Sequence, residues 1–155
     1  MGAIAQEKKS YITPQMKGAI GKEGEAVANA VETGAIRRFA EAIGDSSPLF
    51  NDEVQARKNR YGGVIAPPTF FRSLRAGPLP VQYEVPLKRV LDGGSDWEYF
   101  EPVRPGDTIH VSSRIADMYE REGRMGHMLF TVRETFYRNQ LGQVVATQKS
   151  TGISY

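Results

Sequence analysis

The second half of the chain alternates apolar and polar residues, and this pattern constrains the fold more than any other feature. Ile109, Val111, Ser113 and Ile115 occupy every second position within residues 108–119, and residues 127–138 alternate in the same way. A period of two indicates a strand with one buried face. Turn segments separate such runs at hairpin spacing, so we expect a four-stranded antiparallel meander with strands over residues 95–101, 108–119, 127–138 and 143–155. Residues 120–126 are expected to form a hairpin loop between two of them.

The first half predicts helices. Apolar residues at helical spacing indicate a helix over residues 34–43, with Thr33 as its cap and Gly44 at its end. Asp52 is expected to cap a short helix over residues 53–59. Residues 69–75, after a Pro-Pro pair, predict an apolar, central helix. A buried helix followed by antiparallel strands is an α+β layout, with a curved sheet wrapped around that helix.

The domain organisation follows from the same reading. Residues 1–17 are polar, and Pro14 is expected to interrupt any helix there, so they are interpreted as an irregular N-terminal arm. Residues 18–155 are expected to form a single domain, since a chain of 155 residues buries a core of ordinary size.

Composition excludes several classes of function. The chain has no cysteine, which rules out disulfides and thiol nucleophiles and suits the cytoplasm. Its two histidines, His110 and His127, are too few for a histidine-rich metal site, so no metal is expected. A net charge of +2, without a basic stripe interleaved with aromatic residues, does not indicate nucleic-acid binding. No apolar run is long enough to span a membrane.

Candidate functional residues concentrate in residues 43–74. An acid, Asp45, precedes a proline turn in the run Gly-Asp-Ser-Ser-Pro-Leu-Phe-Asn-Asp, residues 44–52. The run Tyr-Gly-Gly-Val-Ile-Ala-Pro-Pro-Thr-Phe follows at residues 61–70, and Arg-Pro-Gly-Asp forms a later turn at residues 104–107. Together these motifs resemble the MaoC-like, or hydratase-2, dehydratases, and specifically their N-terminal-half (FAS1-like) dehydratase type. The resemblance extends from about Ile12 to the end of the chain.

The resemblance implies a hot-dog fold, in which an antiparallel sheet cradles a long helix, here residues 68–76. It also implies side-by-side dimers that hold acyl thioesters in a tunnel at their interface. The reaction of the family is reversible addition of water to a trans-2-enoyl thioester of CoA or acyl carrier protein, without a further cofactor. Active members activate the water with an Asp and a His on the motif GD-x-N-P-[LIV]-H.

Carried over residue by residue, the resemblance keeps only part of that machinery. Asp45 matches the catalytic acid, although an Asp at this place also suits a turn. Ser47 stands where active members have Asn, and Phe50 where they have His, and a phenyl ring cannot move a proton. Pro68 stands where active members have the Gly whose N–H receives the thioester oxygen, and proline has no N–H.

The remaining site assignments follow the same motifs. Substrate-binding residues are expected at Phe50, Tyr61, Gly62, Gly63, Pro68, Thr69, Phe70 and Phe71. For the phenylalanines the alternative is a place in the core, and for the two glycines a purely conformational role. CoA phosphates or an acidic carrier protein are expected to meet Arg37, Arg57, Lys58 and Arg60, for which a solvated basic face is the alternative.

The pattern suggests a hypothesis about function. On this hypothesis the protein is one of two hot-dog chains of a heteromeric enoyl-thioester hydratase. The partner chain keeps the Asp-His pair on a GD-x-N-P-L-H motif, and the present chain shapes the acyl-binding tunnel. Alternatives are a self-sufficient homodimeric dehydratase, an acyl-thioester binding protein without catalysis, and a thioesterase, because a fold does not fix a function.

Overall fold

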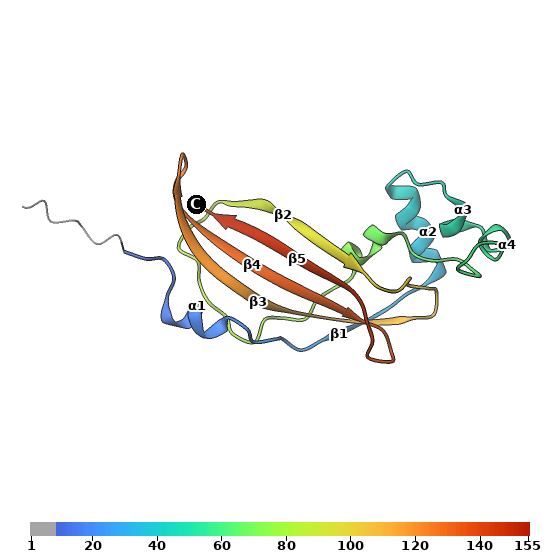
Figure 1. Cartoon of the computed structure of the whole chain (residues 1–155), viewed down its shortest axis with the longest axis horizontal. Helices are drawn as coiled ribbons and strands as arrows, with labels where there is room; N and C mark the ends of the chain where they lie inside the picture. Colours follow the sequence, from blue (N-terminus) through green and yellow to red (C-terminus); the bar gives the residue numbers. More distant parts are fainter. Residues whose placement is uncertain (1–8) are drawn as a thin grey trace, which may run out of the picture.

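A five-stranded antiparallel sheet forms most of the molecule in this computed structural model, which describes residues 9–155 (Figure 1). The strand order is β1-β3-β4-β5-β2. The strands are β1 (Val27–Ala30), β2 (Val90–Tyr99), β3 (Thr108–Gly123), β4 (Gly126–Arg138) and β5 (Val144–Ser154). The helices are α1 (Pro14–Ala19), α2 (Thr33–Ala42), α3 (Pro48–Asn51), α4 (Glu53–Ala56) and a 3-10 helix, η1 (Pro68–Ser73). No helix within these residues is long and apolar enough to cross a membrane.

The order of the strands corrects part of the predicted meander. β3, β4 and β5 are consecutive hairpin neighbours as expected, but β2 pairs with β5 at the far edge rather than with β3. The reason lies in residues 100–107, which cross the end of the sheet. Val103 O accepts from Ala66 N at 2.8 Å, and Val31 O accepts from Gly106 N at 2.8 Å, beside β1. The crossing therefore delivers the chain to β1 before β3 begins.

Strand lengths also differ from the prediction. β2 begins at Val90, five residues earlier than expected, and β3 and β4 extend to Gly123 and Gly126, so the hairpin loop shrinks to a tight turn. Gly126 adopts a φ of 91°, a left-handed conformation that glycine tolerates best. The pairing of β3 with β4 thus continues through residues 120–123, which are mostly charged and show no alternation of apolar and polar residues in the sequence.

The predicted central helix is the largest correction. Residues 68–76 were expected to form a long helix cradled by the sheet, but η1 covers only six residues and lies between one end of the sheet and α2 (Figure 1). Prolines at positions 67 and 68 remove two backbone donors, and Ser73 Oγ donates to Phe70 O at 2.7 Å, which competes with helical bonding. Beyond Leu74 the chain continues without a helix, and Leu79, Tyr83, Val85 and Leu87 cover the inner face of the sheet at its far end.

Two of the three predicted helix-terminal residues have the predicted role. Asp52 caps α4 as predicted, accepting from Gln55 N at 3.0 Å, and Gly44 ends α2 with a φ of 71°. Thr33 is the first residue of α2 rather than its cap, because Glu32 occupies the cap position and makes no side-chain capping bond.

Part of the predicted N-terminal arm is helical. Residues 1–8 of that arm lie outside the described residues. Pro14, expected to interrupt a helix, instead starts α1, because a proline in the first turn loses no needed donor. Thr13 caps this helix, and Met16 is fully buried under the sheet with Ile115, Met118 and Leu129.

Two glycines allow the chain leading to β1 to cross the segment that follows η1. A Cβ on Gly77 would lie 1.8 Å from Glu25 O, and one on Gly24 would lie 2.1 Å from Pro78 O. Only residues without side chains fit such a close approach of two backbones. Beside this crossing the Asn29 side chain of β1 bonds the backbone of Arg75 at 2.9 Å, and β2 is the strand at the other edge of the sheet.

Candidate functional site

The motif segment and the end of β2 enclose a pocket of ≈ 360 Å³. Its lining is mostly apolar and comes from two stretches far apart in sequence, near residues 60–71 and 99–103. The lining residues are Arg60, Tyr61, Ile65, Ala66, Pro68, Phe71, Tyr99, Phe100, Glu101, Pro102 and Val103. An apolar cavity of this size with few polar groups is typical of a small-ligand site.

Arg104 fixes the shape of this pocket. Its Nη1 donates to Tyr61 O at 2.6 Å, and Ala66 N donates to Val103 O at 2.8 Å. The turn over residues 104–107 holds Arg104 in place, since Asp107 Oδ2 accepts from Arg104 N at 2.8 Å. The two family-like motifs are therefore parts of one structural unit, in which the later turn clamps the earlier segment.

Aromatic rings form the wall between the pocket and the sheet. Phe71 packs on Trp97, Tyr99 and Tyr137, with the Phe71 and Tyr137 ring centroids 4.9 Å apart. Trp97 and Tyr99 stack with an interplanar angle of 4°. Burial raises the pKa of Tyr137 to about 12, so its hydroxyl stays protonated at neutral pH.

Asp45 lies outside this pocket, in an exposed turn. Its Oδ1 accepts from Ser47 N at 2.9 Å, and its own N–H donates to Ala40 O at 2.9 Å at the end of α2. Ser47 Oγ accepts from Leu49 N and caps α3. These contacts are those of a turn residue, which was the alternative interpretation of Asp45.

Three of the eight predicted substrate residues line the pocket and five do not. Tyr61, Pro68 and Phe71 line the pocket. Phe50 is only 8% exposed and belongs to the main core, and Phe70 packs on Phe39 with ring centroids 5.5 Å apart. The other three also lie outside its lining: Thr69 is exposed, and Gly62, with a φ of 70°, serves the bend beside Gly63.

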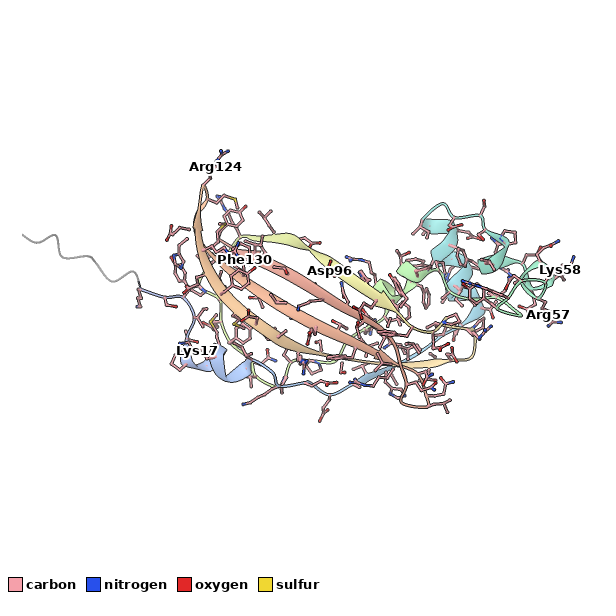
Figure 2. The ribbon with its side chains drawn as sticks, in the orientation of Figure 1. Lys17, Arg57, Lys58, Asp96, Arg124 and Phe130 are labelled. Atoms are coloured by element: carbon pink, nitrogen blue, oxygen red, sulfur yellow. The ribbon has the colours of Figure 1, made fainter. Side chains whose placement is uncertain are left out.

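One of the four predicted cations reaches the pocket. Arg60 lines it and lies 4.8 Å from the centroid of the Tyr61 ring, with Nη2 2.6 Å from the Tyr61 hydroxyl. Arg57 is paired with Glu53 at 2.9 Å, and that bond is the main reason why the pKa of Glu53 is lowered. Figure 2 shows Arg57 and Lys58 at the outer end of the helical region, and Arg37 is exposed on α2.

Neither histidine lines the pocket. His127 lies in the β3–β4 hairpin between Glu120 and Glu122, and His110 lies on β3 opposite Arg138. The sequence reasoning missed the wall from the end of β2, namely Tyr99, Phe100, Glu101, Pro102 and Val103. In the sequence, only the aromatic residues at the end of a predicted strand point to this wall. Its position depends on the pairing of β2 with β5, which the local sequence does not reveal.

Comparisons with known proteins place the chain in a family. A model of the "FAS1-like, dehydratase domain region" matches residues 18–148. A UPF0336 protein of Saccharopolyspora erythraea is 36% identical over 124 residues, covering 77% of each chain. Alignments with three Streptomyces UPF0336 proteins cover 57% to 62% of those relatives. A "probable enoyl-CoA hydratase alpha subunit" of Thermomonospora curvata is 28% identical over 74% of this chain, which spans only 41% of that protein.

Solved structures match the fold. A MaoC-like dehydratase from Rhodospirillum rubrum superposes with a TM-score of 0.69 at 26% identity, covering 88% of this chain and 92% of that one. The HadBC (3R-hydroxyacyl-ACP dehydratase) complex of Mycobacterium tuberculosis gives 0.68 at 21% identity, over 88% and 97% of the two chains. The chain therefore belongs to the FAS1-like dehydratase family and has the hot-dog fold of the MaoC-like dehydratases.

Proposed function

We propose that this chain is the non-catalytic subunit of a heteromeric enoyl-thioester hydratase, in which it shapes the acyl-binding pocket. A partner hot-dog chain supplies the Asp-His pair. The substrate class is a trans-2-enoyl or 3-hydroxyacyl thioester of CoA or acyl carrier protein. The names of two similar proteins support a multi-subunit arrangement, since one is an alpha subunit and the other a complex.

The observation that carries the proposal is the composition of the pocket wall. Among the described residues it contains Arg60, Glu101 and two tyrosines as its polar side chains, and no histidine. At the family's histidine position Phe50 is buried in the core, and Pro68 has no N–H to offer a thioester oxygen. General acid–base help is worth roughly a hundred- to ten-thousand-fold in rate, so these losses remove most of the chemistry from this chain.

The apolar wall retains a binding role. Ile65, Ala66 and Phe71 offer an aliphatic and aromatic surface to an acyl chain, and Arg60 supplies a cation beside it. The other predicted cations, Arg37, Arg57 and Lys58, are proposed to meet the phosphates of CoA or an acidic carrier protein.

Hydration of crotonyl-CoA tests the proposal. The chain is purified alone and also co-expressed with a hot-dog chain that carries the GD-x-N-P-L-H motif. We expect the co-purified complex to be at least about a hundredfold faster than the isolated chain, and replacement of the partner's motif histidine to remove that difference. An isolated chain that turns over as fast as the complex, and slows when Asp45→Asn is introduced, would instead establish the self-sufficient enzyme.

A further inference from the structure

The inner face of the sheet is apolar on β3 but polar on its neighbours β4 and β5 (Figure 1). On β3 this face carries Ile109, Val111 and Ile115, all buried in the two core clusters. On β5, by contrast, every inward residue is small or polar. In order these residues are Ala146, Gln148, Ser150, Gly152 and Ser154. An antiparallel sheet normally turns apolar residues toward its core, so the polar half of this face indicates a contact of another kind.

Strand register gathers polar side chains on β4 and β5. Successive inward residues of β4 are Tyr137, Thr135 and Arg133. Thr135 lies opposite Gln148, and Arg133 lies opposite Ser150. Side chains directly opposite each other have Cβ atoms about 4.5–5.5 Å apart, and alternate residues of one strand lie about 7 Å apart. These five residues, named here the polar strip, therefore form one continuous surface.

Two hydroxyls of the polar strip are almost buried and have no hydrogen-bond partner. Thr135 is 6% exposed and Tyr137 is 3% exposed, and neither hydroxyl bonds to any group among the described residues. Both oxygens still reach the surface, because within residues 9–155 only Ser113 Oγ is a fully enclosed side-chain polar atom without a partner. Covering such hydroxyls without pairing them costs stability. A ligand that covers the polar strip therefore has to bring polar groups of its own.

Arg133 gives the polar strip a single positive charge. Its side chain is exposed and makes no ion pair or hydrogen bond within the part of the chain that the structure describes. Its titratable neighbour is Tyr83, from the segment that follows η1. Burial raises the pKa of Tyr83, and the charge of Arg133 opposes that rise. The polar strip contains no carboxylate, so its charge favours an anionic oxygen group, which a guanidinium binds with two parallel hydrogen bonds.

The polar strip begins at the aromatic wall of the pocket. The ring centroid of Phe71, which lines the pocket, lies 4.9 Å from that of Tyr137. Trp97 packs on Tyr137 as well, and it stacks on Tyr99 of the pocket lining with ring centroids 5.8 Å apart. A chain that leaves the pocket past this wall would run along the polar strip for about 14 Å, the length of four residues of strand.

From this arrangement we propose that the polar strip receives the distal part of an acyl chain that ends in a carboxylate. Arg133 binds that carboxylate, and the hydroxyls of Thr135 and Ser150 donate to it. The inference rests on the proposed function, because it names the class of acyl thioester that the pocket and the polar strip take together. A plain alkyl chain is disfavoured, because it would cover the hydroxyls of Thr135 and Tyr137 without pairing them.

The affinities of paired acyl-CoAs test the inference without any turnover. The two members of a pair have the same chain length and differ only at the distal end: octanedioyl and octanoyl, dodecanedioyl and dodecanoyl, hexadecanedioyl and hexadecanoyl. Isothermal titration calorimetry measures each dissociation constant, for the chain alone and for the complex with its co-expressed partner. We expect the dicarboxylic member to bind at least about tenfold more tightly at one or more lengths. Absence of this preference at every length, in both preparations, overturns the inference.

Three variants assign the preference to the polar strip. Arg133→Met is expected to bring the two affinities of each pair within about twofold, because the cation is lost. Lys149→Met, the matched control, removes the charge next to Ser150 but on the opposite face of β5, and is expected to keep the preference. Thr135→Val is expected to shrink it at least about threefold, since the alkyl member then covers one unpaired hydroxyl fewer.

The variants also define the outcomes that contradict the inference. A preference that survives Arg133→Met, or that Lys149→Met abolishes equally, overturns it. Arg133 and Lys149 are both exposed, so both variants are expected to keep the fold, which thermal melting by circular dichroism verifies. Because affinity rather than turnover is measured, equal affinities leave the hydratase proposal standing, and a failed hydratase assay does not alter a measured preference.

Discussion

Ser112 and Ser113 are adjacent and equally buried, but only one of the two hydroxyls has partners. Ser112 Oγ donates to Glu23 Oε1 at 2.5 Å and accepts from Arg138 Nη1 at 2.8 Å. The hydrogen bond from Ser112 is the main reason why the pKa of Glu23 is lowered. Ser113 faces the core, and its Oγ has no hydrogen-bond partner among the described residues. Because successive side chains of β3 point to opposite faces of the sheet, Ser112 stabilises the fold through hydrogen bonds, whereas Ser113 buries an unpaired hydroxyl.

This difference predicts opposite responses to alanine. Ser112→Ala is expected to lower the free energy of unfolding by about 1–3 kcal/mol, because it removes hydrogen bonds to two charged groups. Ser113→Ala is expected to change it by less than about 0.5 kcal/mol or to raise it, because an unpaired buried hydroxyl is lost. Urea titrations of both variants measure the two values. Equal losses would contradict the assigned roles.

At the scale of elements, the β3–β4 hairpin binds the residues that precede α1. Glu120 accepts from Ser10 Oγ and from Tyr11 N, both at 2.6 Å, and His127 lies between Glu120 and Glu122 at 2.9 Å and 2.7 Å. The hydrogen bond that His127 makes to Glu120, and after it the one to Glu122, raises the pKa of His127. Burial alone would raise the pKa of Glu120, but the bonds from Ser10, His127 and Tyr11 outweigh it and lower that pKa.

The shifted pKa values of His127 and Glu120 make the stability of this contact depend on pH. The contribution of His127 is complete below its ordinary pKa of 6.5 and is lost as pH rises through the raised value. That of Glu120 is present above its ordinary 4.5 and is lost as pH falls through the lowered value. We therefore expect the melting temperature to fall as pH rises above the ordinary histidine pKa of 6.5, and His127→Gln to flatten that decline. His110→Gln, as control, should keep the decline; a variant at position 127 that keeps it as well would refute the assignment.

Local sequence predicted some elements and missed others for physical reasons. The period of two located β3 and β4, because those strands bury one continuous face. The extent of η1 was missed, because Phe70 and Phe71 face different neighbours, α2 and the sheet, which no single helical face predicts. The place of β2 was missed because long-range pairing with β5 decides it. Of the pocket, the motif side was predictable from sequence, and the wall at residues 99–103 was not.

At the scale of the whole molecule, two buried clusters share the same strands. The larger lies near the helical end and includes Ile109, Val111 and Tyr137, and the smaller joins α1 to the sheet through Met16 and Ile115. Because Val111 and Ile115 lie on one strand, β3, loss of either cluster should disrupt the other. The molecule is therefore expected to unfold as one cooperative unit.

Met16→Ala tests this cooperativity. Removing a fully buried methionine is expected to cost about 2–5 kcal/mol. Trp97, the single tryptophan, packs against the larger cluster and so reports that cluster by fluorescence, while circular dichroism reports the whole sheet. Both signals should shift to lower urea concentration together. A transition in circular dichroism that precedes the fluorescence change would show two independent units.

Arg104 holds the Tyr61 segment through a main-chain carbonyl, which any residue type at position 61 would supply. The guanidinium that donates to it has no equivalent among the other side chains, because none combines that reach with a planar set of fixed donors. The bond therefore restricts the residue type at position 104 and not at position 61. In a library with every residue type at each position, we expect almost no substitution of Arg104 to keep the hydrogen bond to the residue 61 carbonyl. Substitutions of Tyr61 should keep that bond and change only the side chain that lines the pocket.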